Sequence, residues 1–262
     1  EHLLKRRPWS ATPSTRAHFT SQPARAAIEG FVDGGGALIA FLAPGTKSGL
    51  EAVLAGFGLN SPDRWVVDPA SLALEGETPG LSPVASHYAQ HPSTHGLGEN
   101  RMTFFRRARA FELRKTEPDD RLRGVVFTSG DAWTDPDVLD LAPGALPDPP
   151  ADARLDYHVL VATAEIERGA GRARIAAFGD ANIASNRDLR ALYNLDLVLN
   201  TIHWALEREP AIALHPKSGG RSLNQFPVPL ERSLQSLYGA GLLIPELLVL
   251  IGGLVWLRQR NA

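Results

Sequence analysis

The distribution of apolar residues predicts a helix followed by a buried strand near the start of the chain. The run "ALIAFLAPG", residues 37–45, has no polar side chain and ends in Pro-Gly, which is typical of a strand covered on both faces in a parallel sheet. The preceding helix would have Ser21 as its N-cap and Pro23 in its first turn, and "DGGG", residues 33–36, would end it. Its predicted buried face consists of Ala26, Ala27, Ile28, Phe31 and Val32.

The pattern continues with a second helix over residues 47–57 and a strand over residues 64–68, which gives a β-α-β rhythm. Residues 69–100 are rich in Pro, Gly, Ser and His and are expected to form an insertion over the sheet. Further strands are predicted within residues 101–115, 124–133, 156–166 and 174–180, the last two as a hairpin-like pair.

The clearest amphipathic helix is expected over residues 187–207. Its apolar side chains recur at i, i+3 and i+4 spacing, which predicts a buried face made of Leu192, Leu195, Leu199, Ile202 and Leu206. The chain would thus comprise an extended arm (residues 1–20), an α/β domain (21–210), a Pro-rich connector (211–236) and a distinct C-terminal segment.

That C-terminal segment has the length of a membrane span. Residues 237–257 contain one charged residue, Glu246, and a helix of this length would extend about 31 Å, close to the thickness of the hydrocarbon core. Arg258 and Arg260 follow at once, so the positive-inside tendency predicts that residues 258–262 are cytoplasmic and that the bulk of the chain is outside. The alternative is a soluble α/β binding module whose last helix packs on its own domain.

One face of the predicted span combines small residues with the acid. Gly239, Glu246 and Gly253 are seven residues apart and therefore lie on one side of a helix. An acid within a membrane usually points toward protein or water, so this face is expected to dock on a partner.

The amino-acid composition excludes several kinds of binding and catalytic site. The net charge is -2 and the basic residues are scattered, which gives no electrostatic footprint for nucleic acid. Cysteine is absent, which excludes disulfides, thiolate catalysis and Cys-based zinc sites. No Walker motif is present, and no cofactor is predicted. The chain starts at Glu1 without a signal peptide, so any export signal is expected upstream.

Candidate catalytic and metal-binding residues each have a simpler structural explanation. Ser129 is the best candidate nucleophile, yet Ser in "TSGD" is typical of a turn. His87, His91 and His95 repeat every four residues, but Pro92 interrupts any regular helix through them, so no metal site is predicted.

The loop "GDANIASN" is the candidate ligand or partner loop. It follows the carboxyl end of a predicted strand, where open α/β sheets place their ligands, and offers Asp180, Asn182, Ser185 and Asn186. Helix capping by Asn186 and loop stabilisation by Asp180 explain the same residues structurally.

Several stretches in order resemble the auxiliary, gliding-motility-associated proteins of bacterial ABC transporters, whose outer domain is related to one in intraflagellar transport proteins. They include "FVDGGGALIAFLAPG", "YAQHPSTHGL", "FTSGDAW", "AAFGDANIASN" and "LVLNTIHWALERE", which are spread over residues 31–209, and the order continues into the Pro-bearing terminal helix with its Arg tail. Members usually carry an N-terminal membrane helix and a strand ahead of the "GGG" helix, which residues 1–20 do not supply.

The resemblance implies a flavodoxin-like or class I amidotransferase-like fold with a mostly parallel sheet, flanking helices and one terminal transmembrane helix. It also implies a non-catalytic accessory subunit in the cytoplasmic membrane of a bacterium. The outer domain would bind a partner or ligand, and the terminal helix would dock on the ABC permease beside its ATPase. An amidotransferase-like hydrolase of the cell envelope is the alternative.

Overall fold

The computed structural model describes residues 21–71, 79–136, 138, 146–151, 153–168, 171–207, 256 and 258–260. The chain divides into two compact units, Glu1–Leu223 and Asn224–Ala262. The predicted arm, the connector and most of the predicted membrane span, including Gly239, Glu246 and Gly253, lie outside the described residues. No helix within the described ranges has the length and apolar character needed to span a bilayer.

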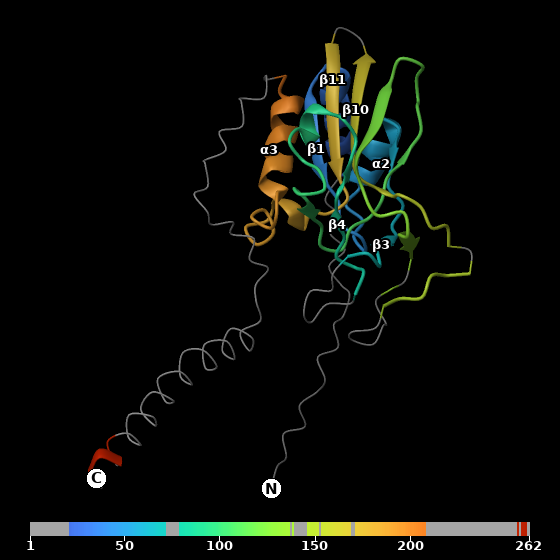
Figure 1. The fold of residues 1–262 in the computed structure, drawn as a ribbon. Coiled ribbons are helices and arrows are strands. Elements are labelled where there is room, and N and C mark those ends of the chain that lie inside the picture. Colours follow the sequence, from blue (N-terminus) through green and yellow to red (C-terminus); the bar gives the residue numbers. More distant parts are fainter. Residues whose placement is uncertain are drawn as a thin grey trace, which may run out of the picture. The chain divides into compact units, whose positions relative to one another are not determined.

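The first unit is built on a five-stranded sheet with the order β1-β11-β10-β8-β5 (Figure 1). Its strands are β1 (Ala37–Phe41), β5 (His87–Tyr88), β8 (Arg121–Phe127), β10 (Val159–Arg168) and β11 (Gly171–Phe178). Three two-stranded ladders join β2 (Leu59–Asn60) to β7 (Glu112–Leu113), β3 (Trp65–Val67) to β9 (Trp133–Asp135) and β4 (Val84–Ala85) to β6 (Thr103–Phe104).

The prediction of a mostly parallel sheet was wrong. Among the strands that the structure describes, only β1 and β11 run parallel, and β10 pairs antiparallel with both β11 and β8. The predicted hairpin is confirmed, and it explains the difference, because a connection of two residues between β10 and β11 forces them to run antiparallel. The β-α-β rhythm was also wrong, since β3 pairs with β9 outside the main sheet.

Helices cover both faces of the sheet (Figure 1). Helices α1 (Gln22–Asp33) and α2 (Leu50–Gly56) contribute Val32, Val53 and Leu54 to a core with alternate side chains of β10 and β11. The other alternate side chains pack against α3 (Asn194–Ala205) through a second core, which includes Leu197 and Trp204. Short 3-10 helices, η1 (Pro92–Thr94) and η2 (Asn182–Ala184), contact α3.

Two predicted helices bury different side chains from those expected. In α1, Val32 is buried, whereas Ala26, Ala27 and Phe31 are exposed. Helix α3 starts seven residues later than predicted, at Asn194, because Leu192 has a positive φ of 47° that ends the preceding turns. Its buried residues are Asn194, Leu197, Val198, Thr201, Trp204 and Ala205, while Leu195, Leu199 and Leu206 of the predicted buried face are exposed.

One buried arginine holds the carboxyl end of β1 to the neighbouring loops. Arg109 is 1% exposed and donates to the carbonyl oxygen of Ser61 at 2.6 Å and to Glu51 Oε1 at 3.2 Å. Its Nη2 also lies 3.9 Å from Asp63 Oδ1. The guanidinium is thereby neutralised and bonded inside the protein, so we assign it a structural role.

Candidate functional site

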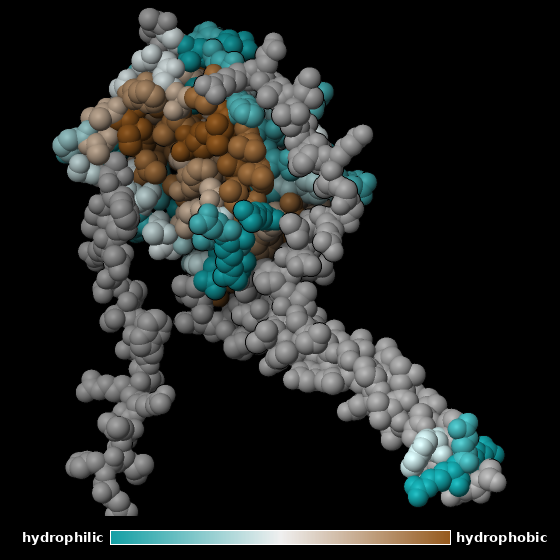
Figure 2. All heavy atoms as spheres, turned by 90° about the vertical axis from the view of Figure 1, so that its left-hand side faces the viewer, coloured by the Kyte–Doolittle hydropathy of each residue, from teal (hydrophilic) through white to brown (hydrophobic). Residues whose placement is uncertain are grey.

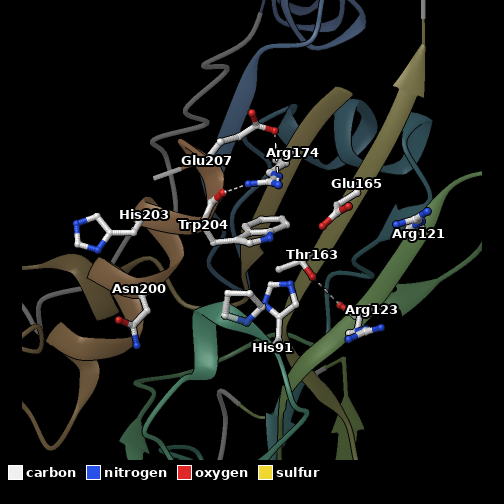
Figure 3. Close-up of a pocket in the computed structure, with 11 residues that line it drawn as sticks. His91, Arg121, Arg123, Thr163, Glu165, Arg174, Asn200, His203, Trp204 and Glu207 are labelled. Atoms are coloured by element: carbon white, nitrogen blue, oxygen red, sulfur yellow. Dashed lines mark hydrogen bonds and ion pairs between the residues drawn. The ribbon is translucent and has the colours of Figure 1, made fainter. Parts of the chain in front are cut away.

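A pocket of about 480 Å³ opens on the α3 face of the sheet (Figure 3). Helix α3 and η1 form its walls, and β8, β10 and β11 form its floor. It is lined by His91, Pro92, Arg121, Arg123, Thr163, Glu165, Arg174, Asn200, His203, Trp204 and Glu207. We call it the α3–η1 pocket.

Strand alternation places the floor residues side by side. Glu165 on β10 is directly opposite Arg121 on β8 and Arg174 on β11, so these three side chains form one row across the sheet. Thr163, two residues earlier, points to the same face and is paired with Arg123 in the next row. The floor therefore carries three guanidinium groups around one carboxylate and a buried threonine.

Arg174 is the most restrained of these arginines. Its Nη1 donates to the carbonyl oxygen of Trp204, its guanidinium lies over the Trp204 ring at 5.5 Å, and its Nη2 is 3.5 Å from Glu207 Oε1. Its Nε is buried and has no hydrogen-bond partner among the described residues. An oxygen supplied by a ligand or by water would satisfy this donor.

The other two arginines are exposed at the mouth of the pocket. Arg123 donates from Nη1 to the carbonyl oxygen of Gln90 at 3.2 Å, which leaves most of its donors available. Counting the two carboxylates, Glu165 and Glu207, the lining retains an excess of one positive charge. Guanidinium groups in this number favour carboxylate, sulfate or phosphate oxygens as ligands.

His91 adds an uncharged donor. Its Nδ1 accepts a hydrogen bond from the backbone N–H of Ser93 at 3.2 Å and lies 2.7 Å from Ser93 Oγ, whose hydroxyl can donate to the same nitrogen. Both contacts favour the neutral tautomer with its proton on Nε2. Burial, reinforced by the positive charge of Arg123, lowers the pKa of His91 to about 4, which keeps the ring neutral at physiological pH. The ring meets Trp204 edge-on at 4.9 Å between centroids.

A second hollow of about 620 Å³ adjoins this pocket and shares His91 and Pro92 with it. It is lined by the loop at residues 88–97. Together the two hollows offer charged donors at one end and an apolar surface from Tyr88 and Leu97 at the other. This arrangement can hold an anionic group attached to a less polar body.

The loop predicted to bind a ligand contributes to neither hollow. Asp180 is fully buried and accepts hydrogen bonds from the backbone N–H groups of Arg106 and Asn182, which stabilises the loop. Burial raises the pKa of Asp180 to about 6. Ser185 Oγ accepts from the backbone N–H of Asp188, and Asn182 and Asn186 are exposed. These contacts confirm that Asp180 stabilises the loop, whereas the predicted helix cap at Asn186 was wrong, because α3 begins at Asn194 with Tyr193 as its N-cap. A binding role of the loop stays a prediction.

Ser129 is held by a carboxylate. Its Oγ donates to Asp68 Oδ1 at 2.6 Å, and its backbone N–H donates to Asp68 Oδ2 at 3.0 Å. Asp68 is 1% exposed, so this pair anchors the turn after β8. A serine nucleophile would instead need its hydroxyl directed at a base such as an imidazole.

The three histidines at four-residue spacing are separated by the fold. His87 stacks edge-on with Tyr157 at 5.1 Å, His91 faces the α3–η1 pocket, and His95 is exposed. In the parts of the chain that the structure describes, no cluster of three or more potential metal ligands occurs.

Sequence reasoning missed the arginines of the pocket, although a signal for them exists. In "RLRG", residues 121–124, and "RAR", residues 172–174, arginine occupies every second position, which directs both guanidinium groups of each strand to one face. In a sheet with its other face buried, such a stripe marks a charged surface.

No family model and no curated protein matches the chain. One of the solved structures with a similar fold is the "mmIFT52 N-terminal domain", with a TM-score of 0.50 and 14% sequence identity, over 71% of this chain and 72% of that one. At this identity the likeness concerns the fold alone. The predicted relationship to a domain of intraflagellar transport proteins is therefore confirmed at the level of the fold.

Proposed function

We propose that this protein is a non-catalytic binding protein that holds an oxyanionic ligand in the α3–η1 pocket. The observation that carries the proposal is the convergence of Arg121, Arg123 and Arg174 on one face of the sheet, beside the neutral Nε2–H donor of His91. Carboxylate, sulfate or phosphate oxygens would accept hydrogen bonds from these groups, and the ring of Trp204 would contact the rest of the ligand.

The pocket is tested by titrating the full chain in detergent with sulfate and, separately, with glucuronate. We expect Arg121→Gln and Arg123→Gln each to weaken binding about tenfold, because a hydrogen bond to a charged group contributes about 1.5 kcal/mol or more. Arg154→Gln is the matched control, since it removes the same charge from a side chain that is 89% exposed outside the pocket.

Equal affinities in all four proteins would overturn the pocket as a binding site. If the parent chain binds glucuronate but not sulfate, the ligand of this pocket is a carboxylate. The opposite result would assign it to tetrahedral anions. Both pocket variants replace exposed side chains, so their far-UV circular dichroism should match that of the parent chain.

We further propose that the domain belongs to a membrane-anchored accessory subunit of a bacterial ABC transporter, positioned on the extracytoplasmic side. This rests on the ordered resemblance to the gliding-motility-associated proteins and on the apolar run at residues 237–257. The likeness of the fold to an intraflagellar transport domain agrees with the outer domain of that family. Coupling to ATP hydrolysis would come from the ATPase partner through the permease.

Co-purification tests this assignment. A permease and an ATPase should be recovered with the tagged full chain, and both should be lost when residues 237–257 are replaced by an unrelated membrane span. Recovery of neither protein with the parent chain would contradict the transporter assignment, but it would not bear on the proposed anion binding in the pocket.

Glu246 provides a narrower test of the same helix. Glu246→Leu should leave the protein in the membrane fraction but reduce recovery of the permease. The substitution removes the carboxylate on the Gly239/Gly253 face, so a polar group of the permease would lose its partner. Leu248→Ala is the matched control on another face. Undiminished recovery of the permease with Glu246→Leu would show that the acid takes no part in docking.

A further inference from the structure

Strand β1 ends the main sheet with one edge unpaired among the described residues. The backbone N–H of Leu42 donates to Phe178 on β11, so by strand alternation Ala37, Ile39 and Phe41 direct their backbone groups to the opposite, outer edge. The strand "ALIAF" has no charge, proline or glycine, which are the usual means of protecting an edge.

Helix α3 presents apolar side chains beside this edge. At 100° per residue, Leu195, Leu199, Ile202 and Leu206 fall within an arc of about 60° on one flank. The opposite flank is polar and faces η1, because Asn200 on it donates to the carbonyl oxygen of His95 at 3.0 Å. Since η1 and the pocket adjoin the strands away from β1, the leucine flank faces the β1 end of the sheet.

On the other face of the sheet, Phe31 of α1 lies beside the start of the same strand. Ala26, Ala27 and Gly30 are exposed, and Phe31 is 59% exposed with its ring against Gly36, directly before β1. Figure 2 looks toward the α3 side and shows a broad hydrophobic surface there. Phe31 on one face and the leucines of α3 on the other, all expected to be buried, are therefore exposed next to one open strand.

We infer that a second copy of this chain covers this surface, with β1 pairing antiparallel to β1 of its partner. A two-fold axis perpendicular to the sheet at Ile39 would pair Ile39 with its own copy and Ala37 with Phe41 of the other. The outward N–H and C=O groups of these three residues would then be paired. The same axis brings the leucine flanks of the two α3 helices together on one face and the two Phe31 side chains toward the partner on the other.

The exposed area suits a dimer. Phe31, Leu195, Leu199 and Leu206 are 43–59% exposed, and at roughly 200 Å² for a fully exposed large side chain they offer roughly 400 Å² per copy. Pairing two copies would bury roughly twice this area, and the strand edge and the partly exposed Ile202 add to it. The total reaches the lower limit of about 1,000 Å² for a specific interface. Because these apolar positions carry no charge, the two copies would meet without like-charge repulsion.

The test is the mass of the full chain in detergent, measured by light scattering with the detergent contribution subtracted. The parent should have twice the chain mass. Leu199→Glu should raise the dissociation constant on the order of a hundredfold and give the single-chain mass, because two glutamates would face each other across the axis. Leu155→Glu, at a leucine that is 52% exposed outside this surface, should stay dimeric.

A second measurement locates the contact. The chain has no cysteine, so Leu199→Cys introduces a unique thiol at a 43% exposed position, and a short bis-maleimide should join two copies at residue 199 but not in a Leu155→Cys control. A parent of single-chain mass would overturn the inference, as would a dimer that survives Leu199→Glu. Cross-linking of Leu199→Cys to a different polypeptide, with none between two copies, would show that another protein covers this surface. None of these outcomes depends on ligand binding in the pocket.

Discussion

At the scale of single residues, the α3–η1 pocket depends on side chains fixed by backbone contacts. Arg174 is held over Trp204 by the carbonyl oxygen of that residue, and His91 is oriented by the backbone N–H of Ser93. Donors that are fixed before a ligand arrives lose little conformational entropy on binding. Arg121 and Arg123 are exposed and would attract an anion to the mouth of the pocket.

The pKa of His91 predicts how stability depends on pH. Because the folded protein holds this pKa at about 4, the unfolded chain, with a pKa near 6.5, binds more protons between these values. The contribution of His91 to the free energy of unfolding is therefore full above pH 6.5 and is lost as the pH falls toward 4. Asp180, whose pKa is raised to about 6, acts in the opposite direction over part of this range.

Comparison with His91→Asn isolates the histidine, because Asp180 affects both proteins equally. Asn retains an acceptor near the Ser93 amide but does not titrate. Both unfolding free energies are measured in urea from pH 7.5 to pH 4.5. The value of the parent minus that of the variant should become steadily smaller as the pH falls. A difference that stays constant over this range would show that His91 titrates normally.

At the scale of elements, Asn194 fixes the start of α3. It is fully buried, its Oδ1 accepts from the backbone N–H of Phe104 at 2.8 Å, and its Nδ2 donates to the carbonyl oxygens of Phe104 and Asp188 at 2.8 and 2.9 Å. One side chain thus joins α3 to β6 and to the loop before the helix.

Asn194→Leu should lower the free energy of unfolding by about 2–4 kcal/mol, because it removes three hydrogen bonds that the buried side chain makes to backbone groups of Phe104 and Asp188. Sulfate binding should weaken as well, since α3 carries Trp204 and Asn200. Asn186→Leu, at an exposed position, should have little effect on either. Urea denaturation checks the first result, and an unchanged midpoint for Asn194→Leu would contradict the role of this side chain.

The elements differ in how far the sequence predicts them. The helix at residues 22–33, the strand at 37–41 and the β10–β11 hairpin follow from caps, apolar runs and turn residues within the sequence. The pairing of β3 with β9 depends on contacts between distant segments, which local patterns do not specify. The exposed leucines of α3 were assigned to the core because periodicity identifies an apolar stripe but not what covers it.

At the scale of the whole molecule, the candidate surfaces lie on different parts of the described domain. The α3–η1 pocket is formed by β8, β10, β11, η1 and the polar flank of α3, whereas β1, α1 and the leucine flank form the surface inferred to dimerise. A dimer of this kind would leave both pockets open. The pocket was missed at the sequence level because its residues come from five elements that only the fold brings together.

The most direct test of the central claim is a sulfate titration of the full chain labelled with ¹⁵N-tryptophan and ¹⁵N-histidine, followed by nuclear magnetic resonance. Among the tryptophans that the structure describes, Trp204 is the one that lines the pocket. We predict saturable shifts at the Trp204 indole and at the His91 Nε2–H, with the resonances of Trp65 and Trp133 unchanged. Equal small shifts at all tryptophans, or none at Trp204 and His91, would contradict oxyanion binding in this pocket.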